Sequence, residues 1–203
     1  MSTLALPWLA VLAWVWDNAA WLGAIALLVL SVSLSATAIG IRRPALALTG
    51  LVPIGLGMLA LAFRIDVPAP HPVLLSLVAL AFAALAIVGG NPVTLFVLGL
   101  TSAGDPRSGE HGGIVVPAEK GTRGSREVLR GGWVIGYLER LAIVAAIVLG
   151  HFEIIAAVIA IKGLGRFAEL DNAEARERFI IGTLTSMIWA TGCAVLIVFS
   201  RLV

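Results

Sequence analysis

The sequence predicts an all-α protein, a polytopic helical bundle that crosses a membrane several times. Three observations predict this fold class: the composition, the length of the apolar stretches and the distribution of basic residues. Of the 203 residues, 60% are hydrophobic and 13% are charged, which is about half the charged fraction of an ordinary soluble domain. The apolar stretches are too long for strands and lack period-two alternation. Residues 1–203 are therefore expected to form a single membrane domain.

Six stretches approach the length of about 20 residues that a helix needs to span a bilayer. In chain order they cover residues 20–41, 45–63, 72–88, 132–150, 152–170 and 177–199. A further apolar segment, residues 4–16, is too short to span and contains three tryptophans. Because tryptophan favours the membrane–water interface, we expect an N-terminal interfacial or re-entrant helix there.

Two short runs interrupt the apolar pattern. The Gly-His dipeptide at residues 150–151 separates the fourth stretch from the fifth and predicts a tight helical hairpin. A second run, Gly89-Gly90-Asn91-Pro92, follows the third stretch. Because Asn suits a helix N-cap and Pro the first helical position, this run predicts a kink or a short interfacial helix that begins at Pro92.

The basic residues predict the orientation of the bundle. Lys and Arg gather in the connections at residues 42–43, 104–130 and 170–177, whereas the opposite side carries only Arg64 and Arg201. By the positive-inside rule, the three basic connections lie in the cytoplasm, so both ends of the chain face outward.

This orientation divides the chain into two three-span halves, residues 1–103 and 131–203, joined by a mobile cytoplasmic loop over residues 104–130. The halves enter the membrane from opposite sides, as the inverted repeats of transporters do, although they share no visible sequence similarity. The first charged residue is Asp17, so no cleavable signal peptide is expected.

Charged residues inside the last three apolar stretches are the main indication of function. A charge at membrane depth costs roughly 2.5–3.5 kcal/mol on insertion scales. Glu139 lies about 10 Å into the fourth stretch and Lys162 about 12 Å from the end of the fifth, by helical rise. Because these stretches run antiparallel, the two side chains reach a similar depth. The candidate ligand- or ion-binding residues are Tyr137, Glu139, Arg140, Lys162, Arg166, Glu169, Glu177 and Thr183.

Two interpretations of this cluster stay open. In the first, Glu139 neutralises Lys162 or Arg140 in a structural ion-pair network. Arg166 and Glu169 then extend to the interface. In the second, the cluster is a site open to the cytoplasm. Guanidinium and ammonium groups on one helical stripe suit phosphate or carboxylate, and a buried Glu suits proton coupling.

The last third of the chain resembles a family of bacterial integral membrane proteins. The resemblance rests on three motifs: Gly132-Trp133-Val134-Ile135-Gly136-Tyr137-Leu138-Glu139-Arg140, Lys162 with Arg166-Phe167, and Glu177 with Gly182-Thr183-Leu184. It covers about residues 131–195, and it departs from the family at Gly163, where the family has Ser, and at Arg178, where it has an aromatic residue. The family has no assigned activity. The resemblance therefore implies a multi-pass protein of the bacterial plasma (inner) membrane and marks these positions without giving their role.

The sequence shows no catalytic constellation, no metal-binding cluster and no cofactor motif. The three histidines are scattered, so no zinc site is expected. The single cysteine, Cys193, lies in an apolar run and is interpreted as a small filler. A net charge of +2 is too small to indicate nucleic acid. The expected partners are the lipid bilayer, a small anionic solute or lipid headgroup, and a protein docked on residues 104–130.

These observations favour a small transporter or channel in which Glu139, Arg140, Lys162 and Arg166 form a cytoplasm-facing site. A first alternative is a non-catalytic membrane subunit or scaffold of a complex. A second alternative is an enzyme that acts on an anionic lipid, with Glu139 as base and the cationic side chains on phosphate. Because no known catalytic arrangement is present, a non-enzymatic role is favoured.

Overall fold

The structure is a computed structural model that describes residues 7–65, 71–101, 132–167 and 173–200. Within these ranges the structure consists of helices joined by short turns and contains no strand. The helices are α1 (Pro7–Gly40), the 3-10 helix η1 (Pro44–Gly50), α2 (Leu51–Ala62), α3 (Pro72–Thr101), α4 (Gly132–Leu149), α5 (Glu153–Phe167) and α6 (Ala173–Ser200). The predicted all-α fold class is thereby confirmed. The predicted loop over 104–130, with its docking role, lies outside the described residues.

Five helical segments are long and apolar enough to cross a membrane. They are Asn18–Gly40, Pro44–Ala62, Pro72–Thr101, Gly132–Leu149 and Ala173–Ser200. The protein is therefore a multi-pass membrane protein. The predicted span at 152–170 corresponds to α5, which has 15 residues. Within the described residues, that length gives about 22 Å, which is shorter than the hydrocarbon core of a bilayer, about 30 Å.

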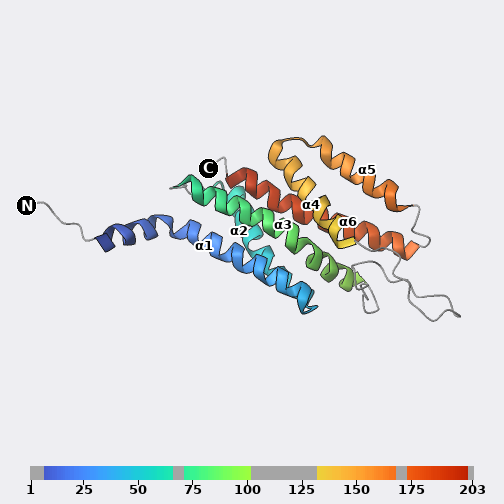
Figure 1. The fold of residues 1–203 in the computed structure, drawn as a ribbon, viewed down its shortest axis with the longest axis horizontal. Coiled ribbons are helices and arrows are strands. Elements are labelled where there is room, and N and C mark those ends of the chain that lie inside the picture. The colour runs from blue at the N-terminus through green and yellow to red at the C-terminus, as the bar shows by residue number, and fades with distance from the viewer. Residues whose placement is uncertain (1–6, 66–70, 102–131, 168–172, 201–203) are drawn as a thin grey trace, which may run out of the picture.

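The helices lie side by side in an elongated bundle (Figure 1). Helix α3 is central, because it packs against α1, α4, α6 and η1. Helix α6 packs against α3 and α4, while α5 packs on α4 at the edge of the bundle. Gly150, with a φ of 76°, forms the tight turn between α4 and α5 that the sequence predicts.

Helix α1 differs from the separate N-terminal helix that the tryptophans suggested. It runs unbroken from Pro7 to Gly40, so residues 7–16 continue directly into the apolar segment. Asn18 lies inside this helix and donates from Nδ2 to the Trp14 carbonyl at 2.6 Å. The side chains of Trp8, Trp14 and Trp16 are exposed.

Helix α3 also runs further than predicted. It continues through Asn91 and Pro92 to Thr101, so the predicted short helix beginning at Pro92 is wrong. Proline removes one helical N–H and crowds the preceding turn. In a membrane such a position is tolerated when neighbouring helices satisfy the loosened backbone groups. Pro92 leaves the Val88 carbonyl without its helical donor; in the same turn, Arg140 Nε of α4 donates to the neighbouring Ile87 carbonyl at 2.9 Å.

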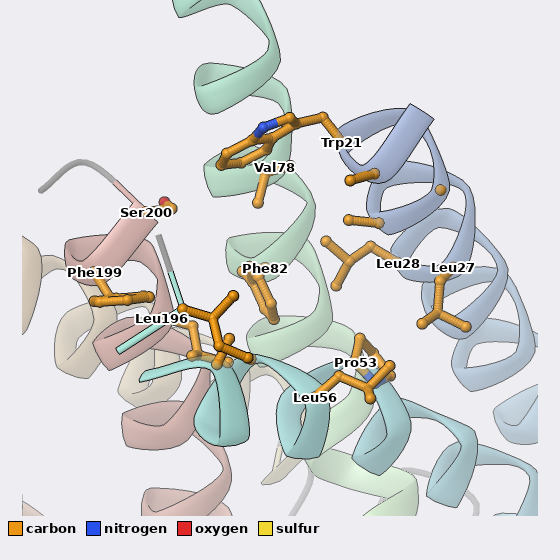
Figure 2. Close-up of a pocket in the computed structure, with 16 residues that line it drawn as sticks. Trp21, Leu27, Leu28, Pro53, Leu56, Val78, Phe82, Leu196, Phe199 and Ser200 are labelled. Atoms are coloured by element: carbon orange, nitrogen blue, oxygen red, sulfur yellow. The ribbon is translucent and has the colours of Figure 1, made fainter. Parts of the chain in front are cut away.

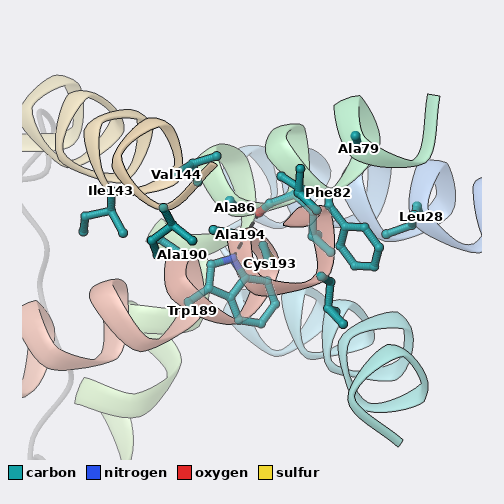
Figure 3. Packing of buried hydrophobic residues seen from close by; sticks show 14 of the residues in the cluster. Leu28, Ala79, Phe82, Ala86, Ile143, Val144, Trp189, Ala190, Cys193 and Ala194 are labelled. Carbon is teal, nitrogen blue, oxygen red and sulfur yellow. Dashed lines mark hydrogen bonds between the residues drawn. The ribbon is translucent and has the colours of Figure 1, made fainter. Parts of the chain in front are cut away.

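The core centres on Trp189 of α6, which is buried between α3 and η1. Its indole Nε1 donates to the Leu85 carbonyl at 3.0 Å. A Cβ atom added at Gly50 or Gly89 would come within 2.7 Å of the indole ring. Figure 3 shows the ring beside small side chains of α6, including Cys193 and Ala194. Because lipid offers no hydrophobic driving force between helices, this close packing supplies the stabilisation.

Candidate functional site

Glu139 and Arg140 of α4 face different neighbours although they are adjacent in sequence. Consecutive residues of an α-helix point about 100° apart. Glu139 therefore reaches α5, whereas Arg140 reaches α3 and α6. This divergence separates the predicted cluster into two parts.

The first part is an ion pair between α4 and α5. Lys162 Nζ donates to Glu139 Oε2 at 2.5 Å, and the two side chains are 17% and 12% exposed. The ammonium group also lies 5.9 Å from the centre of the Phe179 ring on α6. Glu139 and Lys162 neutralise each other, and their pair ties the edge helix α5 to the bundle.

The second part is a buried cation between three helices. Arg140 is 3% exposed. Besides its bond to the Ile87 carbonyl, it donates from Nη1 to Ser186 Oγ at 3.1 Å. Its guanidinium carbon lies 5.2 Å from the centre of the Tyr137 ring. Within the described part of the chain, no carboxylate lies within ion-pair distance of this guanidinium.

Two glycines make room for Arg140. A Cβ atom at Gly90 of α3 would overlap Arg140 Cδ, and one at Gly136 of α4 would lie 3.3 Å from Nη1. The side chain therefore lies across the backbones of both helices. Gly136 and Arg140 share one helical face, since they are four residues apart.

Arg140 Nη2 is buried and lacks a hydrogen-bond partner among the described residues. The same holds for Thr183 Oγ1 on α6. Thr183 precedes Ser186 by three residues and so lies on the same side of α6. Buried polar groups are usually paired, and leaving one unpaired costs about 1–3 kcal/mol. We call the group formed by Tyr137, Arg140, Thr183, Ser186 and the Ile87 carbonyl the Arg140 junction.

Three predicted residues remain, and the structure describes the side chain of one of them. Glu177 is exposed near the start of α6. Arg166 lies in the last turn of α5, but its side chain and the whole of Glu169 lie outside the described part of the structure.

The sequence reasoning missed Ser186, Gly90 and the Ile87 carbonyl. Gly90 carries a signal, because a glycine in a membrane helix permits close approach of a neighbour. The run Gly89–Pro92 predicts a helix break, however, and no pattern in the sequence links this turn to Arg140.

The charges of the site leave one cation uncompensated. Glu139 and Lys162 cancel, and Arg140 remains protonated at any physiological pH. The arrangement therefore offers one fixed positive charge, a guanidinium donor and hydroxyl groups at membrane depth. Among the described residues, no group of His, Cys, Asp and Glu could hold a metal ion. Comparisons of the chain with known protein families, curated proteins and solved structures found no match.

Proposed function

We propose that the protein is a small transporter or channel that binds a small anionic solute at the Arg140 junction. The observation that supports this proposal is the buried guanidinium of Arg140, whose Nη2 lacks an acceptor among the described residues. Charges at membrane depth are costly, and they usually mark the path of an ion or solute through a bundle.

The donors at the junction suit an oxyanion or a halide. A guanidinium group binds carboxylates and oxyanions through parallel N–H donors. Ser186 accepts from Arg140 through its oxygen, so its own O–H proton is available to a ligand. Thr183 offers a second hydroxyl. With a net charge of one from Glu139, Arg140 and Lys162, the junction favours a monovalent anion.

The proposal places the entrance on the cytoplasmic side. Arg140 lies eight residues after Gly132, or about 12 Å from the start of α4 by helical rise. Residues 104–130, which precede α4, are rich in basic residues and belong in the cytoplasm by the positive-inside rule.

The membrane arrangement that goes with this proposal has six crossings in the plasma membrane of a bacterium, as the resemblance of residues 131–195 suggests. The tryptophan-rich start of α1 would lie at the outer interface, where tryptophan is favoured.

The Glu139–Lys162 pair has a structural role in this proposal. Its two charges are paired with each other, so the pair has little remaining charge to offer a solute. It holds α5 beside α4 and leaves Arg140 as the binding cation.

Anion flux from proteoliposomes tests the proposal. Vesicles loaded with chloride, nitrate or formate are compared for wild type, Arg140→Gln and Arg140→Lys. We expect flux of at least one of these anions in the wild type. Arg140→Gln should lower that flux about tenfold or more, because it removes a charge-assisted donor. Arg140→Lys should retain an intermediate rate, because lysine keeps the positive charge but lacks the paired N–H donors of a guanidinium group.

Arg178→Gln is the matched control, because Arg178 is also on a described helix but pairs with Glu174 at 3.7 Å, outside the junction. It should transport like the wild type. Size-exclusion profiles in detergent show whether each variant is folded. Wild-type flux in a folded Arg140→Gln protein, or no wild-type flux above protein-free vesicles, contradicts the proposal.

A further inference from the structure

A cavity of about 350 Å³ lies between α1, α2, α3 and α6 (Figure 2). Helices α1 and α2 are joined through η1, and both pack on it. The cavity lies between α1 and α2, away from η1. Small residues of α1 and α2, including Gly23 and Gly57, form part of its wall. Phe82 of α3 and Leu196 of α6 point into it (Figure 2). A Cβ atom added at Gly23 meets nothing within 4 Å, so a larger side chain fits at this position of the wall.

The lining favours hydrocarbon over water. Apart from Trp21 and Ser200, the side chains that line the cavity are apolar. The hydroxyl of Ser200 already donates to the Ile197 carbonyl at 2.9 Å. A buried water needs two to four polar partners, which this lining does not supply. In a membrane, the apolar medium at hand is the acyl chains of the surrounding lipids.

A positively charged residue, Arg64, follows the end of α2 and is adjacent in sequence to Ile65, which lines the cavity. The chain turns at Arg64, whose φ is 51°, and the Ile65 N–H bonds back to the Ala60 carbonyl at 2.9 Å. This turn brings Ile65 into the cavity wall and leaves the Arg64 side chain exposed. An arginine at a helix end in a membrane reaches the headgroup region, where it attracts phosphate.

We propose that this cavity binds one acyl chain of a phospholipid whose phosphate lies against Arg64. A volume of about 350 Å³ lies within the usual range of ligand pockets, about 300–1,000 Å³. The apolar lining selects the chain, and Arg64 selects an anionic headgroup. The site is independent of the anion site, because the cavity contains no residue of the Arg140 junction.

Native mass spectrometry tests this site. The protein is extracted in a mild detergent, delipidated and incubated with phosphatidylglycerol or phosphatidylcholine, and the bound lipid per chain is measured. Wild type should retain one phosphatidylglycerol. Gly23→Leu fills the cavity and should lower retention about tenfold or more. Arg64→Gln should weaken phosphatidylglycerol binding about fivefold.

Two matched controls accompany these variants. Gly55→Leu places the same side chain on an exposed position of α2 that also has nothing within 4 Å and does not line the cavity. Arg42→Gln changes an exposed arginine that also has a positive φ, 54°, after α1. Both should retain lipid like the wild type.

Photolabelling of the wild type with a phospholipid that carries a diazirine on its acyl chain remains informative if Gly23→Leu misfolds. We expect labels on Phe82 and Leu196. Equal retention in folded Gly23→Leu and Gly55→Leu proteins overturns the proposal. So do labels confined to outward-facing side chains such as Leu80, which is 68% exposed. Unchanged phosphatidylglycerol binding in Arg64→Gln contradicts the proposed contact between Arg64 and the lipid phosphate.

Discussion

At the scale of single residues, the main feature is the contrast between two neighbours on α4. Glu139 meets an opposite charge on α5, whereas Arg140 meets a carbonyl, a hydroxyl and an aromatic face. Neutral partners lower the cost of burying a guanidinium without cancelling its charge. The proposed anion site therefore rests on Arg140 and not on Glu139.

The fit between Gly90 and Arg140 gives a stability prediction. Gly90→Ala places a Cβ atom 2.4 Å from Arg140 Cδ, 2.8 Å from Nε and 3.1 Å from Cζ. Moving this side chain breaks its bonds to α3 and α6. We expect the free energy of unfolding to fall by about 1–3 kcal/mol, measured by denaturant titration in mixed micelles. Gly165→Ala on α5, where the added Cβ meets nothing within 4 Å, is the control and should cause no loss.

The ion pair gives a second residue-scale prediction, because the cost of removing one charge should be recovered by removing both. Glu139→Gln leaves the Lys162 ammonium unpaired at membrane depth, and Lys162→Met leaves the carboxylate unpaired. Each single change should destabilise the protein by about 1–3 kcal/mol, between the values for exposed and buried pairs. The double variant should lose less than the sum of the two single losses. Strict additivity in this double-mutant cycle would show that the contact contributes nothing.

At the scale of elements, α3 shows how neighbouring helices override a local signal. The run Gly89–Pro92 contains the residues that end helices in water. In the bundle, the Trp189 ring instead packs directly against Gly89, and the Arg140 side chain packs against Gly90. The glycines are thus sites of close approach inside one continuous helix.

The α3–α6 contact gives a prediction at this scale. Trp189→Phe removes the indole donor to the Leu85 carbonyl and leaves unfilled volume beside Gly50 and Gly89. We expect the free energy of unfolding to fall by about 1–3 kcal/mol. Unfolding is monitored by the circular dichroism of the helices, because this signal does not depend on the number of tryptophans. Trp16→Phe, at a side chain that is 81% exposed, is the control. A loss equal in the two variants would contradict the packing role of Trp189.

At the scale of the whole molecule, the ends of the helices separate into two groups. Helices α1 and α3 end, and α4 begins, toward one end of the bundle (Figure 1). Helix α2 ends and α3 begins toward the other end. The basic residues of the sequence predict that the first group is cytoplasmic.

Cysteine labelling in intact cells tests this orientation. The natural Cys193 is buried, so an impermeant maleimide should label the native wild type poorly. His71→Cys, on the predicted outer side, should be labelled in intact cells. Arg43→Cys should be labelled only after the membrane is opened. The reverse pattern would invert the topology, and with it the side from which the Arg140 junction is reached.

Part of the candidate site follows from the sequence alone. Residue spacing and antiparallel direction put Glu139 and Lys162 at one depth, and the structure shows them in contact. The partners of Arg140 do not follow from spacing. Ser186 is 46 residues away and Ile87 is 53 residues away along the chain, and a carbonyl group carries no sequence signal.

The sequence by itself determined that this protein is helical and belongs in a membrane, because the length and apolarity of its segments require backbone hydrogen bonds to be satisfied within each helix. Only the tertiary structure decided that α1 and α3 run unbroken, that Glu139 is paired, and that Arg140 is buried without a carboxylate in the described part of the chain. These outcomes depend on which helix faces meet. Helix packing in lipid is set by close approach at glycines and a few polar contacts, and those contacts join residues far apart in the sequence.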